Sequence, residues 1–242
     1  MSRLPSMRLL AVAAMFASQL AHADVSLELR AVDDVVLLGD NAVIGLYAVS
    51  DTPGMNHPIS AVEAVITWDP ATFALVGLDG TGGAPLIFSG FPAAGSGGLN
   101  EAIVPQDGDL FYLALGQLGA TIDATPNGTL ITSLVFEAVS SGTDSLIEIQ
   151  ADGGAPLVAT TVYDGVIPNT DVTCTLGSET VSVSCGIADL APPYGTLDFS
   201  DVLAFLTFFD NMDPEADFAS PSGTFDFSDV IAFLIAFDAG CP

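Results

Sequence analysis

The sequence predicts a mainly β protein in two parts, an all-β sandwich followed by a small α-helical module. Short β-branched or alternating stretches, separated by Gly, Pro, Asn and Asp, run from Val25 to about Ser184 and are typical of a sandwich. Near residue 185 the composition changes, and an internal repeat with an offset of 28 residues fills the rest of the chain. Half of the 242 residues are apolar, so this acidic chain has enough material for folded cores.

Residues 1–23 have the pattern of a secretory signal peptide. Arg3 and Arg8 precede an apolar run, and the small-residue sequence Ala21-His22-Ala23 follows it. The run has about 12 residues, shorter than the roughly 20 that a membrane-spanning helix needs. We therefore expect export to the periplasm, the cell surface or the medium, with a mature chain that begins at Asp24.

The charge balance excludes several classes of function. The chain has 30 Asp and Glu against 3 Lys and Arg, a formal net charge of −27, and it contains no lysine. A basic groove for nucleic acid and a polybasic attraction to anionic lipid are therefore ruled out. Chemistry that depends on lysine is excluded for the same reason.

Alternation with a period of two predicts the strands of the sandwich. In Ser60–Trp68 the apolar side chains at 62, 64, 66 and 68 share one face, and Asp69-Pro70 ends the strand in a turn. The stretch 80–100 contains seven glycines and is predicted to be a long loop. The expected strands are Val25–Arg30, Ser60–Trp68, Phe73–Leu78, Leu110–Gly116, Thr129–Val139, Leu146–Gln150 and Val172–Val183.

The C-terminal repeat is the most specific feature of the sequence. Residues 189–214 and 217–242 share 16 identities in 26 aligned positions, which chance does not produce. Each copy begins with an aspartate-rich loop that contains a glycine and continues into an apolar segment with helical spacing. The faces expected to pack on each other are Val202, Phe205, Leu206 and Phe209 of the first helix and Val230, Phe233, Leu234 and Phe237 of the second.

The opposite sides of the two predicted helices are apolar as well. They carry Leu203 and Phe208 in the first helix, and Ile231 and Ile235 in the second. A module of fewer than 60 residues has little interior for a second apolar face. Exposed apolar surface of this kind marks an interaction site, and packing onto the sandwich is the alternative.

The spacing of the aspartates suggests calcium-binding loops. An EF-hand loop supplies oxygen ligands from positions 1, 3, 5, 7, 9 and 12 and has glycine at position 6. In both copies the last two aspartates fit positions 9 and 12, and the first fits position 1 only if the loop holds one extra residue. Positions 3 and 5 lack carboxylates, so the alternative is that the aspartates only cap helices. The candidate ligands are Asp189, Thr196 (through its carbonyl), Asp198 and Asp201, and in the second copy Asp217, Thr224, Asp226 and Asp229.

Disulfides are expected in an exported chain. Cys185 and Cys241 bracket both repeats, so a bridge between them would join the ends of the module. A bridge from Cys174 to Cys185 across the last hairpin is the alternative, because three cysteines allow three pairings. We favour the Cys185–Cys241 bridge.

From Cys185 to the terminal Gly240-Cys241-Pro242, the duplicated loop and helix resemble a dockerin module, in the variant that ends in Gly-Cys-Pro. The resemblance rests on the duplication and on two Asp-Phe-Ser-Asp-Val segments, 198–202 and 226–230. It implies calcium in the loops and docking onto a cohesin-type or other surface protein, with loop positions 10 and 11 prominent in recognition. The residues predicted to contact the partner are Phe199, Ser200, Leu203, Phe208, Phe227, Ser228, Ile231 and Ile235.

The upstream part, residues 24–184, resembles a cohesin domain or a related carbohydrate-binding sandwich. Ile59–Leu78 is similar to that family's strand, Tyr-Asp-Pro turn and strand, with Trp68 in the place of the tyrosine, and Gly128–Val139 is a second match. The resemblance implies a β-sandwich of jelly-roll type. Trp68 has two interpretations, a core side chain or an exposed platform for sugar, and its inward position on the strand favours the core.

These observations predict an exported, non-catalytic protein that mediates noncovalent assembly or attachment at the cell surface. His57 is the only histidine after residue 23, and no nucleophile motif accompanies it. One alternative is a carbohydrate-binding sandwich that recruits a complex to polysaccharide. The least supported is a secreted glycoside hydrolase, because no carboxylate pair stands out among the acidic residues.

Overall fold

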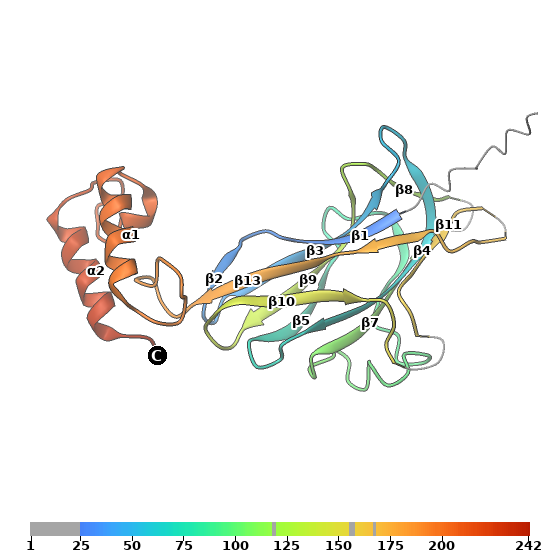
Figure 1. The fold of residues 1–242 in the computed structure, drawn as a ribbon, viewed down its shortest axis with the longest axis horizontal. Helices are drawn as coiled ribbons and strands as arrows, with labels where there is room; N and C mark the ends of the chain where they lie inside the picture. Colours follow the sequence, from blue (N-terminus) through green and yellow to red (C-terminus); the bar gives the residue numbers. More distant parts are fainter. Residues whose placement is uncertain (1–24, 118–119, 155–157, 167) are drawn as a thin grey trace, which may run out of the picture.

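The computed structural model describes residues 25–242, apart from 118–119, 155–157 and 167. Two β-sheets pack face to face, and two helices form a separate module beyond the end of the last strand (Figure 1). The predicted signal peptide, residues 1–23, lies outside the described residues. In the described part, no helix is both long enough and apolar enough to cross a membrane.

One sheet has five strands in the order β12-β1-β3-β9-β5, and the other has the order β2-β13-β10-β4-β7-β6, with β8 and β11 also paired to β4. Neighbouring strands are antiparallel except β1 with β12 and β2 with β13. The strands are β1 (Val25–Ala31), β2 (Val35–Leu37), β3 (Asn41–Ser50), β4 (His57–Trp68), β5 (Phe73–Asp79), β6 (Leu86–Gly90), β7 (Asp109–Gly116), β8 (Ile122–Ala124), β9 (Thr129–Ala138), β10 (Gly142–Gln150), β11 (Thr161–Asp164), β12 (Thr173–Leu176) and β13 (Ser178–Ser184).

The core of the sandwich lies between the two sheets. Val62, Ala64, Ile66 and Trp68 of β4 are all buried in it, as the alternation predicts. The Trp68 indole Nε1 donates a hydrogen bond to the main-chain oxygen at position 73, 2.8 Å away. Its ring meets Phe136 of the opposite sheet edge-on, with centroids 5.4 Å apart. Trp68 is therefore a core residue, which removes it as a platform for sugar.

The predicted strand Val172–Val183 is wrong: the segment forms two strands, β12 and β13, in different sheets. Between them, the N–H of Gly177 donates to the Leu27 oxygen (2.8 Å), and the Gly177 oxygen accepts from the Ile149 N–H (3.1 Å). A Cβ on Gly177 would lie only 3.1 Å from the Cα of Glu28. Glycine therefore lets the chain step from one sheet to the other between closely spaced backbones.

The predicted loop at 80–100 is also wrong in part, because Leu86–Gly90 forms β6 at the edge of the larger sheet, where it pairs with β7. Ile87 and Phe88 on this strand are 59% and 40% exposed. The strand is not predicted because its apolar stretch is short and has glycines on both sides. The sequence also gave no prediction for β2, β3, β8 and β11.

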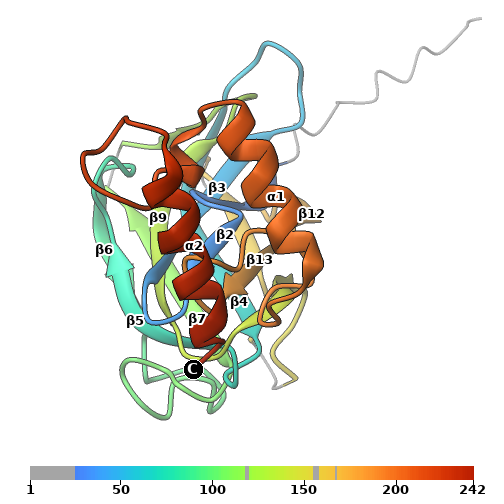
Figure 2. The ribbon, with the colours of Figure 1, turned by 90° about the vertical axis from the view of Figure 1, so that its left-hand side faces the viewer.

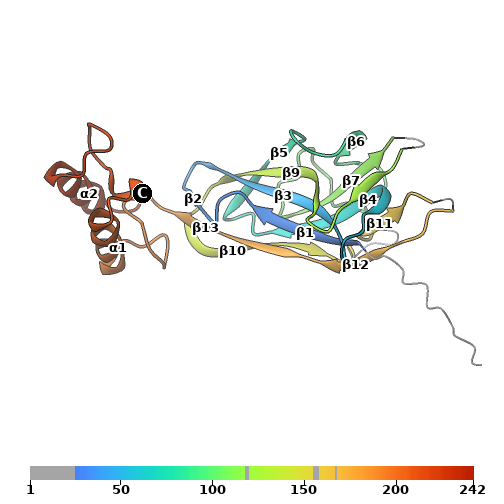
Figure 3. The same ribbon diagram turned by 90° about the horizontal axis from the view of Figure 1, so that it is seen from above.

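The C-terminal module has a core of its own, separate from that of the sandwich. It consists of α1 (Phe199–Asp210), the short 3-10 helix η1 (Pro214–Ala216) and α2 (Phe227–Ala239). The two helices lie side by side in Figure 2, and Figure 3 shows the module standing clear of the sheets beyond β2 and β13. The Phe205 and Phe233 rings stack with centroids 4.1 Å apart and planes within 7°, and Phe218 meets both edge-on.

We expect Phe136→Ala to lower the free energy of unfolding of the sandwich by about 3–5 kcal/mol, because the substitution opens a cavity beside Trp68 in the buried core. Urea unfolding followed by fluorescence of Trp68, the single tryptophan, measures the change. Ile87→Ala on the exposed edge strand is the control, with an expected change within about 0.5 kcal/mol. Equal effects of the two substitutions would contradict this placement of the core.

Candidate functional site

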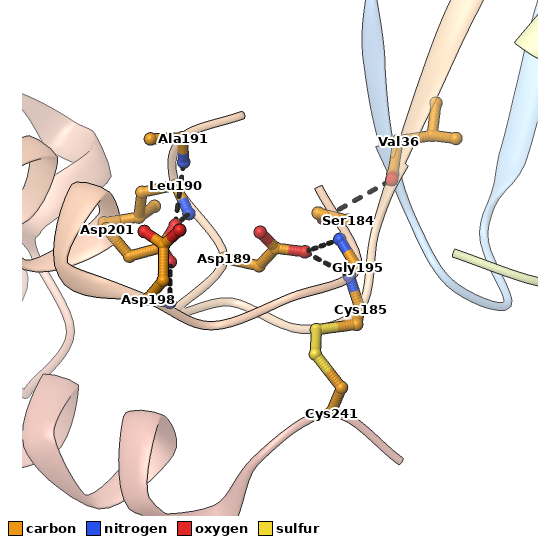
Figure 4. The surroundings of a disulfide bond; sticks show 10 residues. All are labelled: Val36, Ser184, Cys185, Asp189, Leu190, Ala191, Gly195, Asp198, Asp201 and Cys241. Carbon is orange, nitrogen blue, oxygen red and sulfur yellow. Dashed lines mark hydrogen bonds between the residues drawn. A yellow bond between two sulfur atoms is a disulfide. The ribbon is translucent and has the colours of Figure 1, made fainter. Parts of the chain in front are cut away.

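The module is attached where β13 ends. The chain passes from Ser184 into Cys185, which forms a disulfide with Cys241 near the C-terminus, with Cα atoms 5.2 Å apart (Figure 4). The bridge joins the two ends of the module, and the alternative bridge from Cys174 to Cys185 is not formed. The two sulfur atoms and the Asp189 carboxylate lie close together, but sulfurs bonded to each other are not thiolate metal ligands.

Both helices begin with the same arrangement of aspartates. Asp198 caps α1 by accepting from the N–H of Ser200 at 2.6 Å, and Asp226 caps α2 by accepting from that of Ser228 at 2.7 Å. The reciprocal half of each capping box is also present, since a second aspartate three residues later accepts from the N–H of the cap residue. The sequence alternative of helix capping is therefore realised in both repeats.

Those second aspartates, Asp201 and Asp229, are fully buried. Asp201 accepts from the N–H of Asp198 on Oδ2 (2.8 Å) and from the N–H groups at positions 190 and 191 on Oδ1 (2.8 and 2.9 Å). Asp229 accepts from Asp226 on Oδ2 (2.9 Å) and from the N–H at position 219 on Oδ1 (2.8 Å). These bonds, that of Asp226 first, hold the pKa of Asp229 below its ordinary value, whereas burial acts in the opposite direction.

The first aspartate of each repeat ties the loop to its glycine. Asp189 Oδ2 accepts from the N–H of Cys185 and of Gly195, both at 2.7 Å (Figure 4). Asp217 Oδ2 accepts from the Gly223 N–H at 2.6 Å. Gly195 and Gly223 have φ angles of +89° and +81°, which favour glycine at these turns. In both aspartates Oδ1 is buried without a hydrogen-bond partner among the described residues.

As arranged, the loops do not fit an EF-hand-type calcium cage. Such an ion takes six to eight oxygen ligands, whereas each loop leaves one carboxylate oxygen of its first aspartate without a partner. Within the described residues, no three acidic, histidine or cysteine side chains converge apart from the group that contains the disulfide. Thr196 and Thr224 lie on exposed turns. The calcium sites predicted from the sequence stay untested predictions.

Each helix exposes apolar side chains, and their positions largely repeat across the duplication. Phe199 and Phe227, the first residues of α1 and α2, are 69% and 72% exposed. One and two turns later, Leu203 and Leu206 correspond to Ile231 and Leu234, whereas Ile235 corresponds to Thr207. The full set is Phe199, Leu203 and Leu206 on α1 and Phe227, Ile231, Leu234 and Ile235 on α2. We call these seven residues the outer face of the module.

Three residues of the helices lie elsewhere than the sequence predicts. Leu206 and Leu234 were expected in the interface between the helices but are each 51% exposed. The stacked rings of Phe205 and Phe233 occupy the centre of that interface, and Phe218 closes its side, so the next residue on each helix turns outward. Phe208, predicted to contact a partner, packs instead against the module core and lines a groove of about 570 Å³ between the module and β2.

The two serines predicted to contact a partner differ in their exposure. Ser228 is exposed, whereas Ser200 is half-buried, and both use their N–H groups in the helix caps.

Among the described residues, those to consider for catalysis are His57 and two glutamates on strands. His57 is half-buried at the start of β4, and its Nε2 has no hydrogen-bond partner among the described residues. Burial raises the pKa of Glu63, which also lies on β4, whereas Glu137 is exposed on β9.

No family model matches the chain, and no curated protein matches it. Solved structures that are similar to it include cohesin modules. One is a cohesin module of a family 33 glycoside hydrolase from Clostridium perfringens, 12% identical, with a TM-score of 0.48, covering 66% of this chain and 97% of that one. The seventh ScaB type I cohesin from Pseudobacteroides cellulosolvens is 10% identical, with a TM-score of 0.45, covering 66% and 92%. A type II cohesin domain from the cellulosome of Acetivibrio cellulolyticus is 12% identical, with a TM-score of 0.43, covering 65% and 95%.

We expect loss of the Cys185–Cys241 bridge to destabilise the module but not the sandwich. The bridge closes a loop with a sequence separation of 56, and a bridge over that length contributes on the order of 4 kcal/mol in the chain-entropy model. Thermal melts of the Cys185→Ser, Cys241→Ser double variant, followed at the helical circular dichroism band, test this. Trp68 fluorescence is the internal control, and an unchanged helical melting temperature would contradict the prediction.

Proposed function

We propose that this chain is a non-catalytic assembly protein whose C-terminal module docks onto a partner protein through its outer face. The observation that carries the proposal is the repetition of exposed apolar side chains at equivalent positions of both helices. Complete burial of one phenylalanine side chain is worth about 1.5–3 kcal/mol. Phe199 and Phe227 are thus the natural anchors of an interface.

The charge of the module indicates what kind of surface the partner presents. Residues 185–242 contain ten acidic side chains and no lysine or arginine. A partner with an apolar centre and a basic rim is complementary to this module. The resemblance of the module to dockerins makes a cohesin-type surface protein the first partner class to consider. In this proposal, docking through the outer face does not require calcium in the loops.

In this proposal the sandwich is the structural body that carries the docking module. Its resemblance to cohesins suggests a second binding surface of its own, and export would place both parts outside the cytoplasm. Recruitment to polysaccharide is the competing role. Trp68, the residue considered as a platform for sugar, cannot serve that role because it is buried and hydrogen-bonded in the core.

We expect Phe199→Ser with Phe227→Ser to abolish partner capture, because each hot-spot aromatic costs about 2 kcal/mol or more when truncated. The mature chain is immobilised and exposed to the secreted fraction of its source, and proteins retained by the wild type are then purified and titrated calorimetrically. The matched control is Ile87→Ser with Leu146→Ser, two exposed apolar residues of the sandwich.

Three results would count against docking by the outer face. The first is equal affinity of the purified partner for the wild type and the phenylalanine double variant. The second is loss of binding in the sandwich control alone. The third is retention of the wild type on insoluble polysaccharide without any protein partner, which would support the competing role.

A further inference from the structure

We propose that buried carboxylates have replaced a metal ion at the centre of both repeat loops, so that the module folds and keeps its stability without calcium. Asp201 and Asp229 are the central groups. This inference concerns how the module is held together and goes beyond its proposed docking role. It would stand even if the outer face bound nothing.

The first argument is the direction of the backbone in the loops. An EF-hand-type loop turns oxygen atoms toward its cation. Here the N–H groups at positions 190, 191 and 198 point at the Asp201 carboxylate, at 2.8–2.9 Å. N–H groups carry partial positive charge and stabilise an anion at this position. The loop is built around a negative group where a calcium loop holds a positive one.

The second argument is that the same solution occurs in both copies. Positions 219 and 226, which correspond to 191 and 198, donate their N–H groups to the Asp229 carboxylate, at 2.8 and 2.9 Å. At position 218, which corresponds to 190, the N–H instead donates to the main-chain oxygen of Ala216, 3.1 Å away. Both carboxylates are fully buried. The arrangement thus recurs in both copies of the duplicated sequence, which indicates a property of the repeat.

The third argument is the supply of ligands. The stretches at loop positions 3 to 5 are Ala191–Tyr194 and Ala219–Ser222, and neither contains a carboxylate. Among the buried carboxylate oxygens of the described loops, those without a hydrogen-bond partner are Oδ1 of Asp189 and of Asp217, one in each loop. One buried carboxylate oxygen is far short of the six to eight oxygens of a calcium coordination shell, and a single water molecule can serve it.

Other interactions supply the cohesion that an ion would give. The Cys185–Cys241 disulfide closes the module, the stacked pair Phe205 and Phe233 joins the repeats, and a complete capping box begins each helix. None of these contacts requires a bound metal ion.

The test is the melting temperature of the helical signal in the mature chain, measured in millimolar calcium chloride and in excess EDTA, with magnesium chloride as the control for general screening of the acidic surface. We expect the same value in all three solutions. A rise of more than about 5 °C in calcium alone would overturn the proposal. Calorimetric titration that shows two stoichiometric calcium sites would do so as well.

Substitutions separate the two roles of the central aspartate. We expect Asp201→Asn to lower the melting temperature by about 5 °C or more, equally in calcium and in EDTA, because the new amide group faces N–H donors. The control is Asp210→Asn, the same change at an exposed position on α1, with no expected shift. A loss confined to the calcium solution would show that Asp201 acts through the ion. Asp229→Asn provides the same comparison in the second repeat if the first variant fails to fold.

Discussion

The C-terminal part of this protein depends on one constraint. Its module buries carboxylates but contains no cationic side chain to pair with them. Residues 185–242 contain no basic residue, yet Asp189, Asp201 and Asp229 are at most 4% exposed. A buried carboxylate is costly unless hydrogen-bond donors surround it. The backbone N–H groups of the loops supply those donors, and the path of each loop follows from the need to reach them.

The same bonds make each loop and its helix a single unit. Asp201 receives N–H groups from the start of its loop and from Asp198, the cap of α1, so the loop cannot open without exposing the helix terminus. The two units are then joined by Phe205 and Phe233, and the disulfide holds their ends together. Hydrogen bonds within each repeat, together with the ring contact and the disulfide between the repeats, give so small a module a defined structure.

The sequence predicts the features that depend on period or on repetition. It locates the β4 core face, the buried Trp68 and both helices, because alternation and duplication leave direct traces in the residues. It misses β3 (Asn41–Ser50) at the centre of a sheet, where a nearly continuous apolar run has no clear alternation. It also places Leu206 inward, because a helical stripe does not reveal that the stacked Phe205 and Phe233 rings occupy the centre of the contact between the helices. The direction of the loop N–H groups is a property of the backbone path and leaves no trace in residue types.

The exposed outer face follows from the closed loops. Phe199 and Phe227 directly follow Asp198 and Asp226, whose side chains are fixed by the cap hydrogen bonds. The caps set where each helix begins, and the Phe205–Phe233 contact sets how the helices lie against each other. The separation of the two exposed phenylalanines is therefore determined by buried groups, and a rigid pair of apolar anchors binds with less loss of conformational entropy than two mobile ones. The buried aspartates thus contribute to recognition without touching a partner, because they hold the groups that would.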